Sequence, residues 1–299
     1  MKKKAFVSLI ACLICLALAG GIAYASFSLG IYRNFAELSE NEIENIDYRI
    51  TAEDKNSDTT IFTIHGGGIA GGTSQLATAL ADRGGFNLYL FEGIKSVDNL
   101  NLHLTSTEFD EATAINMVSN STTSVSFIGT REETSLSTYV GGQNKLLGRL
   151  ITLHLQAAGF NVQDSPYVPV NIAGVLNSNI VNKNKPLLGT YEMGGVQIAV
   201  SRGMRNALLE DEAYLQSYII NIDKALSSSW PLVVETLSLK FDVDHTSDTG
   251  LGAMIQRFSK NILSNQSDND IDQILQEVLE HDFDSPEALL DELKESANH

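Results

Sequence analysis

Between about residues 30 and 226 the sequence alternates short strand-like runs with longer helix-like runs, and no other feature constrains the fold as strongly. The strand-like runs are rich in β-branched and aromatic residues and occupy 59–64, 86–92, 123–129 and 194–201. The helix-like runs have apolar residues at helical spacing and occupy 73–84, 144–159 and 205–228. Such alternation predicts an α/β protein, with an open mixed sheet and helices on both of its faces.

The first 25 residues have the composition of an export signal. Lys2–Lys4 precede a long apolar run, and Ala23–Ala25 places small residues at the positions that a signal peptidase requires. We therefore predict a signal peptide over residues 1–25 and a secreted or cell-surface protein. An uncleaved membrane anchor is the alternative, because roughly 18 apolar residues can just span a bilayer.

Cysteine usage narrows the chemistry of the mature protein. The two cysteines, Cys12 and Cys15, both lie in the predicted signal. After its removal the chain would have no thiol for a disulfide, a nucleophile or a metal.

The chain is strongly acidic, and the acidity is concentrated near its end. The net charge of −17 argues against a nucleic-acid partner, which requires clustered Lys and Arg. Residues 240–299 contain 14 acidic and four basic residues. We predict a domain over residues 31–230, followed by an acidic helical extension over 231–299 that solubilises the protein or docks a protein partner.

The stretch "TIFTIHGGGIAGGTSQL" places glycines between a predicted strand and a predicted helix. Gly66, Gly68 and Gly71 match the G-x-G-x-x-G pattern of dinucleotide-binding proteins, and Glu92 ends the next strand, where an acid would bind a ribose hydroxyl. A dinucleotide-binding protein is therefore one alternative, although it gives His65 no role. The same stretch contains the "HGGG" of lipase-like hydrolases, but the G-x-S-x-G pentapeptide that those enzymes need occurs nowhere in the chain.

Several further motifs occur in a fixed order along the chain. They are "IYRNFAELSENE", "DYRI", "HGGGI-GGTS", "LYLFEGIKS", "NLHLTSTEFDE", "YVGG", "NIVNKN" and "GVQIAVSRGMR". Together they resemble the poly-γ-glutamate hydrolase family over about residues 31–226. The resemblance implies a fold similar to that of the zinc carboxypeptidases and a zinc-dependent hydrolysis of γ-glutamyl bonds.

The chain departs from the family pattern at the positions that would carry this chemistry. The resemblance assigns a zinc ligand to His65, which is present. Two further ligand positions hold Ala70 and Ile128, and the position of the general base holds Ala199. None of these side chains binds a metal or accepts a proton, so we predict a degenerate zinc site and a protein without zinc-dependent catalysis.

Two functions from different classes follow. In the first, the protein binds poly-γ-glutamate or a γ-glutamyl peptide without cleaving it and needs no cofactor. In the second, it is an active zinc hydrolase whose site is rebuilt from His65 and His103 with Glu92, Glu108 or Asp110.

Polar groups shared with the family are the candidates for substrate binding. They are Lys95, His103, Arg202, Arg205 and Ser74. Cationic side chains would meet the carboxylates of a γ-glutamyl chain, which arginine binds with two parallel hydrogen bonds.

Overall fold

The computed structural model describes residues 30–164, 166–185 and 194–227. The predicted signal segment 1–25 and the predicted acidic extension 231–299 lie outside the described residues. No helix within those ranges combines the length and the apolarity that crossing a bilayer requires.

The core of the fold is a seven-stranded sheet with the strand order β1-β3-β2-β4-β7-β5-β6. The strands are β1 (Tyr48–Glu53), β2 (Thr59–Gly67), β3 (Asn87–Gly93), β4 (Thr123–Gly129), β5 (Ser137–Gly142), β6 (Asn161–Asp164) and β7 (Val196–Val200). The central strands β3, β2, β4 and β7 are parallel to one another. β1 runs antiparallel to β3, and β5 runs antiparallel to β7. The sheet is therefore mixed, with a parallel centre.

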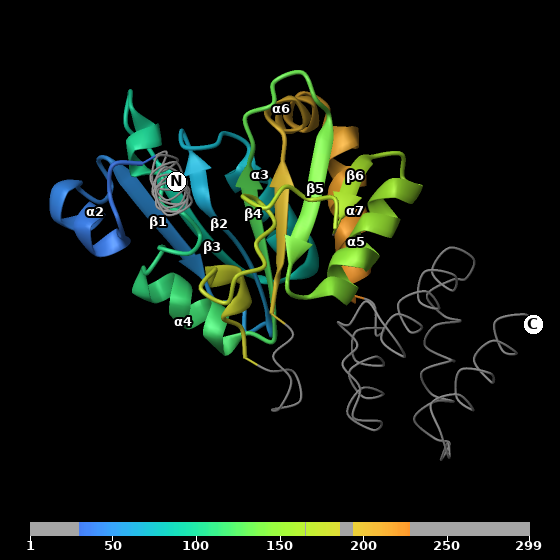
Figure 1. Ribbon diagram of the computed structural model, residues 1–299, viewed down its shortest axis with the longest axis horizontal. Helices are drawn as coiled ribbons and strands as arrows, with labels where there is room; N and C mark the ends of the chain where they lie inside the picture. The colour runs from blue at the N-terminus through green and yellow to red at the C-terminus, as the bar shows by residue number, and fades with distance from the viewer. Residues whose placement is uncertain (1–29, 165, 186–193, 228–299) are drawn as a thin grey trace, which may run out of the picture.

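Helices cover both faces of this sheet. They are α2 (Phe35–Asn41), α3 (Thr73–Gly84), α4 (Ala112–Asn120), α5 (Lys145–Ala157), α6 (Arg202–Glu210) and α7 (Glu212–Ser227), with 3-10 turns η1 (Asn99–Leu102) and η2 (Ile180–Asn182). Figure 1 shows α2 and α4 toward the β1 side of the sheet, α5 and α7 toward the β6 side, and α6 beyond the end of β7. The predicted fold class is confirmed.

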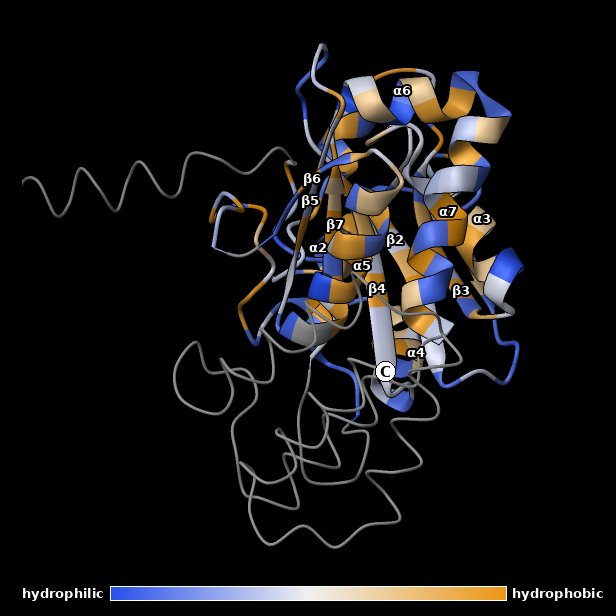
Figure 2. Cartoon of the chain, turned by 90° about the vertical axis from the view of Figure 1, so that its right-hand side faces the viewer, coloured by the Kyte–Doolittle hydropathy of each residue, from blue (hydrophilic) through white to orange (hydrophobic). Residues whose placement is uncertain are grey.

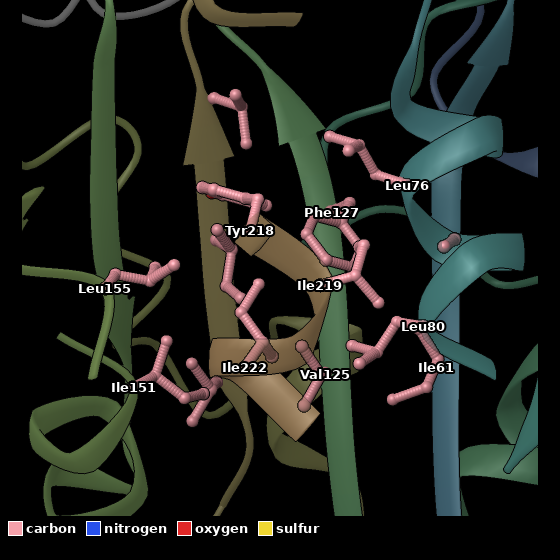
Figure 3. Close-up of a cluster of buried hydrophobic side chains, with 14 of the residues drawn as sticks. Ile61, Leu76, Leu80, Val125, Phe127, Ile151, Leu155, Tyr218, Ile219 and Ile222 are labelled. Atoms are coloured by element: carbon pink, nitrogen blue, oxygen red, sulfur yellow. The ribbon is translucent and has the colours of Figure 1, made fainter. Parts of the chain in front are cut away.

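One apolar cluster lies between the sheet and the helices α3, α5, α6 and α7. Figure 3 shows its centre, where Val125 and Phe127 of β4 meet Leu80 of α3 and Ile219 of α7. The helices are amphipathic, and Figure 2 shows hydrophobic and hydrophilic residues on the same helix in α3, α5, α6 and α7. Burial of their apolar faces against the sheet fixes these helices in place.

A second apolar cluster covers the opposite face of the sheet. Phe62 of β2 and Phe91 of β3 pack there with Leu38 of α2, Val118 of α4 and Ile180 of η2. Since both faces are covered, β3 is buried along its whole length and β2 everywhere except its two end residues.

The predicted elements are largely present, with one error in the helices. The single helix predicted over 205–228 is wrong, because α6 ends at Glu210 and α7 begins at Glu212. Asp211 between them has an extended backbone, with φ −128° and ψ 105°. Its side chain accepts hydrogen bonds from the backbone N–H groups of Ala213 and Tyr214, so it caps α7 instead of continuing α6.

Candidate functional site

The carboxyl ends of β2, β3, β4 and β7 meet at one edge of the sheet, which is where open α/β sheets bind ligands. At this edge the chain turns from β2 through residues 65–73, here called the glycine turn, into α3. Gly67 and Gly72 in the turn have positive φ values of 59° and 98°. Residues with a side chain rarely adopt this conformation, so the shape of the turn requires these glycines.

Hydrogen bonds within the glycine turn fix its shape further. The N–H of Ala70 donates to the carbonyl of His65 at 2.8 Å, and the Thr73 hydroxyl donates to the same carbonyl at 3.1 Å. The N–H of Gly67 donates to Ser74 Oγ at 3.3 Å. Ser74, which we predicted to bind substrate, is 6% exposed and supports the turn from within.

Two histidines predicted to belong to the site are in direct contact. The rings of His65 and His103 are stacked, with centroids 4.2 Å apart and planes 7° from parallel. His65 Nε2 lies 2.8 Å from the carbonyl of Leu104, which can only accept, so Nε2 carries the proton. Burial lowers the pKa of His65 to about 4. The pKa of His103 is lowered to about 3, mainly by burial and to a smaller extent by the neighbouring His65.

The stacked pair does not fit a shared zinc ion. A zinc ion lies about 2.0–2.1 Å from a histidine nitrogen, along a lone pair in the plane of the ring. Two nearly parallel rings with centroids 4.2 Å apart direct their lone pairs along separate planes and not toward one point. Within residues 30–227, gaps excepted, no group of three or more His, Cys, Asp or Glu side chains is placed to hold a metal.

The acids proposed for a rebuilt site have other partners or lie in solvent. Glu92 accepts two hydrogen bonds from Arg49, the shorter at 2.7 Å. Asp110 accepts from the N–H of Phe35 at 2.6 Å, and Glu108 is exposed. The pairing with Arg49 also engages the carboxylate that the dinucleotide interpretation assigns to a ribose hydroxyl.

The three positions that depart from the resemblance lie at this same edge of the sheet. Ile128 of β4 and Ala199 of β7 are paired neighbours in the sheet, and their exposed fractions are 6% and 0%. Ala70 lies beside the end of β4, since its Cβ would be 2.7 Å from a Cβ added at Gly129. The edge that follows His65 is therefore lined with apolar side chains at these three positions.

The predicted cationic residues are not gathered into one patch. Lys95 Nζ lies 2.8 Å from both carboxylate oxygens of Glu42, which also accepts from Tyr32. Arg202 is exposed and pairs with Glu133 at 2.8 Å. Arg205 is only 4% exposed, and its guanidinium donates to backbone carbonyls.

Arg49 and Glu42 are two residues near the site that the sequence analysis did not single out. Arg49 faces Glu92 as its paired neighbour across the β1–β3 ladder. The ion pairs Arg49–Glu92 and Lys95–Glu42 cannot be predicted from neighbouring residues, because the partners lie more than 40 positions apart in the sequence. Knowing that β1 joins the sheet beside β3 would have indicated the first of them.

Comparison with known proteins identifies the family. The sequence profile described as poly-gamma-glutamate hydrolase matches residues 32–224. The chain belongs to the poly-gamma-glutamate hydrolase family. A solved structure of a bacteriophage poly-gamma-glutamate hydrolase has the same fold, with a TM-score of 0.62 and 30% identity, and the match covers 68% of this chain and 99% of that one. A zinc-free, apo structure of YndL gives a TM-score of 0.60 and 33% identity over 67% of this chain and 99% of that one.

Relatives of this poly-gamma-glutamate hydrolase family member occur in Bacillus subtilis strain 168. The UPF0714 protein YndL is 39% identical over 60% of this chain and 66% of its own length. The UPF0714 protein YmaC is 35% identical over 61% of this chain and 74% of its own length. The SPbeta prophage-derived UPF0714 protein YoqZ is 38% identical, but the match spans 51% of this chain and 54% of YoqZ. The chain thus spans just under two thirds of YndL and about half of YoqZ.

Proposed function

We propose that this family member is an exported protein that binds poly-γ-glutamate or a γ-glutamyl peptide without hydrolysing it by a zinc mechanism. One observation carries the proposal. Ala70, Ile128 and Ala199 occupy the positions that the family resemblance assigns to two zinc ligands and the general base, and they lie together at the carboxyl edge of the sheet.

The chemistry of the remaining donors supports this proposal. His65 is the one ligand position that still carries a donor, and since its Nε2 donates to the carbonyl of Leu104, Nδ1 is the single ring nitrogen left for a metal. Three nitrogen or oxygen ligands are usual for a catalytic zinc, so His65 by itself does not suffice. An apolar residue is also the better occupant of a buried position when no cation is present, because an unpaired buried carboxylate is costly.

An accessible cation at this edge supports binding of an anionic ligand. The Arg202 side chain is 58% exposed, and its partner Glu133 is 70% exposed. An ion pair so open to solvent contributes little to stability. Arg202 can therefore exchange Glu133 for a carboxylate of a γ-glutamyl chain at small cost.

Titration of poly-γ-glutamate into the full chain, followed by calorimetry, tests the binding half of the proposal. We expect saturable binding that R202A weakens about ten-fold, the loss of a charge-assisted hydrogen bond. R83A is the matched control, because Arg83 is an exposed arginine paired with Asp223 in the last turn of α3, at the end of that helix opposite the glycine turn. Equal affinity of R202A and wild type would remove Arg202 from the site, and no binding by wild type would contradict the proposal.

Polymer length after incubation tests the catalytic half. The proposal predicts no shortening beyond a protein-free control. Shortening that a chelator abolishes would favour the second candidate, an active zinc hydrolase built on His65 and His103.

Export and the acidic extension are proposals that rest on the sequence. Cleavage after Ala25 predicts a mature protein that begins at Ser26. Amino-terminal sequencing of the exported protein distinguishes this from an uncleaved anchor, which would leave Met1 or the residues directly after it. The extension over 231–299 is proposed to dock a protein partner.

A further inference from the structure

The guanidinium of Arg205 joins three segments that are distant in the sequence. Its Nε donates to the carbonyl of Gly71 in the glycine turn at 2.7 Å. Its Nη1 donates to the carbonyl of Thr130, directly after β4, at 3.2 Å. The same nitrogen donates to the carbonyl of Val200, the last residue of β7. One side chain on α6 thus ties the turn to the ends of two central strands.

The surroundings of Arg205 are shaped to admit it. A Cβ added at Gly129 would lie 2.5 Å from Nη1, and a Cβ at Gly72 would lie 3.0 Å from the Arg205 Cβ. The side chain is buried, and burial lowers its pKa to about 10, so it remains charged at neutral pH. In the described part of the chain, no carboxylate forms a salt bridge with it, so the charge is met by carbonyl oxygens.

The glycine turn needs such a tie. It contains five glycines between residues 66 and 72, and glycine loses more conformational freedom on folding than any other residue. Thr73 and Ser74 bond the turn to its own neighbours, and the N–H of Gly68 donates to the carbonyl of Gly93 at the end of β3 at 2.8 Å, but none of these bonds reaches β4 or β7. The resemblance would join the turn to β4 through a shared zinc, but Ala70 and Ile128 offer no donor for one.

We propose that Arg205 is a positioning residue that holds the glycine turn against β4 and β7, so that the turn keeps its shape without a metal. Its N–H donors join the turn to β4 and β7, as zinc ligands on the turn and on β4 would join those two segments. This inference does not depend on polymer binding. An experiment can therefore contradict the role of Arg205 without contradicting polymer binding, and the reverse.

Hydrogen exchange of backbone amides in the full chain, without polymer, tests the proposal. R205K keeps the charge but replaces the planar fork by a single nitrogen, which cannot reach all three carbonyls. We expect amides of residues 67–73 to exchange about ten-fold faster, while amides of β1 keep their wild-type rates. R202K is the matched control on the same helix and should leave both regions unchanged. Unchanged exchange in the turn would overturn the proposal, and so would uniform acceleration throughout the chain, which would make Arg205 a general stabiliser.

A second variant covers the case in which R205K does not fold. G129A adds a methyl group 2.5 Å from Nη1 while keeping the arginine, but the same methyl group would lie 2.7 Å from the Ala70 Cβ in the turn itself. The variant is therefore A70G/G129A, which removes that direct contact, and A70G alone is its control. Exchange in the turn should be about ten-fold faster in A70G/G129A than in A70G. Equal rates in the turn of these two variants would overturn the proposal.

A chelator tests whether a bound metal holds the glycine turn. The proposal predicts that EDTA leaves exchange in the wild-type turn unchanged. Acceleration by EDTA would mean that a metal holds the turn, which contradicts the proposal.

Discussion

At the scale of single residues, burial decides the charge state of the two histidines near the site. His65 and His103 are both held neutral, because an imidazolium stacked in this position would lose its hydration without gaining a carboxylate. Lys95 and Glu42 form an ion pair, with Nζ 2.8 Å from the carboxylate.

Acid should destabilise the protein through these histidines. Their folded pKa values of about 4 and about 3 lie below the ordinary value of 6.5. Between pH 6.5 and about 4 the unfolded chain binds more protons, so the free energy of unfolding falls as the pH is lowered through this window and is unaffected by these groups above it. H103F keeps an aromatic ring in the stack but cannot titrate. Denaturant titrations at several pH values should show that H103F loses about 3 kcal/mol less than wild type between pH 6.5 and 4. Parallel pH curves for the two proteins would contradict this explanation.

Removing the charge of Lys95 should destabilise the fold. In K95M the Glu42 side chain, which is 7% exposed, would remain buried with Tyr32 as its hydrogen-bond donor but without its counter-ion. We expect a loss of about 2–3 kcal/mol in the free energy of unfolding, measured with urea. K185M removes a lysine from the far more exposed pair with Asp58 and should change stability by less than about 1 kcal/mol. Equal effects of the two substitutions would show that burial of the Lys95 pair has no energetic importance.

At the scale of elements, the sequence predicts the helices and strands that have a clear apolar spacing. It misses the strands that are defined mainly by pairing with their neighbours in the sheet. The spacing of apolar residues predicts α3 and β4 at their observed bounds. The strands β1, β5 and β6 were not predicted. β1 has a single buried residue among six, β5 ends in two glycines, and β6 has only four residues. The break between α6 and α7 was missed because the apolar spacing continues through it, although an aspartate followed by a glutamate is a known helix start.

The capping role of Asp211 can be measured. D211A removes the oxygen that accepts from Ala213 and Tyr214 and should lower the free energy of unfolding by about 1 kcal/mol. D211N keeps an acceptor and should cost much less. If D211A is as stable as wild type, the two helices do not depend on this cap.

For the candidate site, the local sequence pattern indicated the turn between β2 and α3 but not the partners of its side chains. The glycines and His65 mark a turn after a central strand, which is a local pattern. The stack of His103 on His65 and the tie from Arg205 to Gly71 depend on which strands are neighbours, and these contacts join residues 38 and 134 positions apart. No local pattern predicts contacts of this kind.

At the scale of the whole molecule, the chain has the fold of its family, while Ala70, Ile128 and Ala199 stand where the resemblance expects two metal ligands and a general base. Two solved relatives match the fold, with TM-scores of 0.62 and 0.60. The centre instead contains two stacked neutral rings, three apolar residues and one buried guanidinium. We infer that the fold of this chain does not depend on the metal.

Zinc stoichiometry of the purified full chain tests this central claim most directly. Elemental analysis after dialysis against trace zinc should give a value near zero, both for wild type and for the H65N control, which removes the last ligand position. About one zinc per chain in wild type, lost in H65N, would contradict the claim and place the metal on His65.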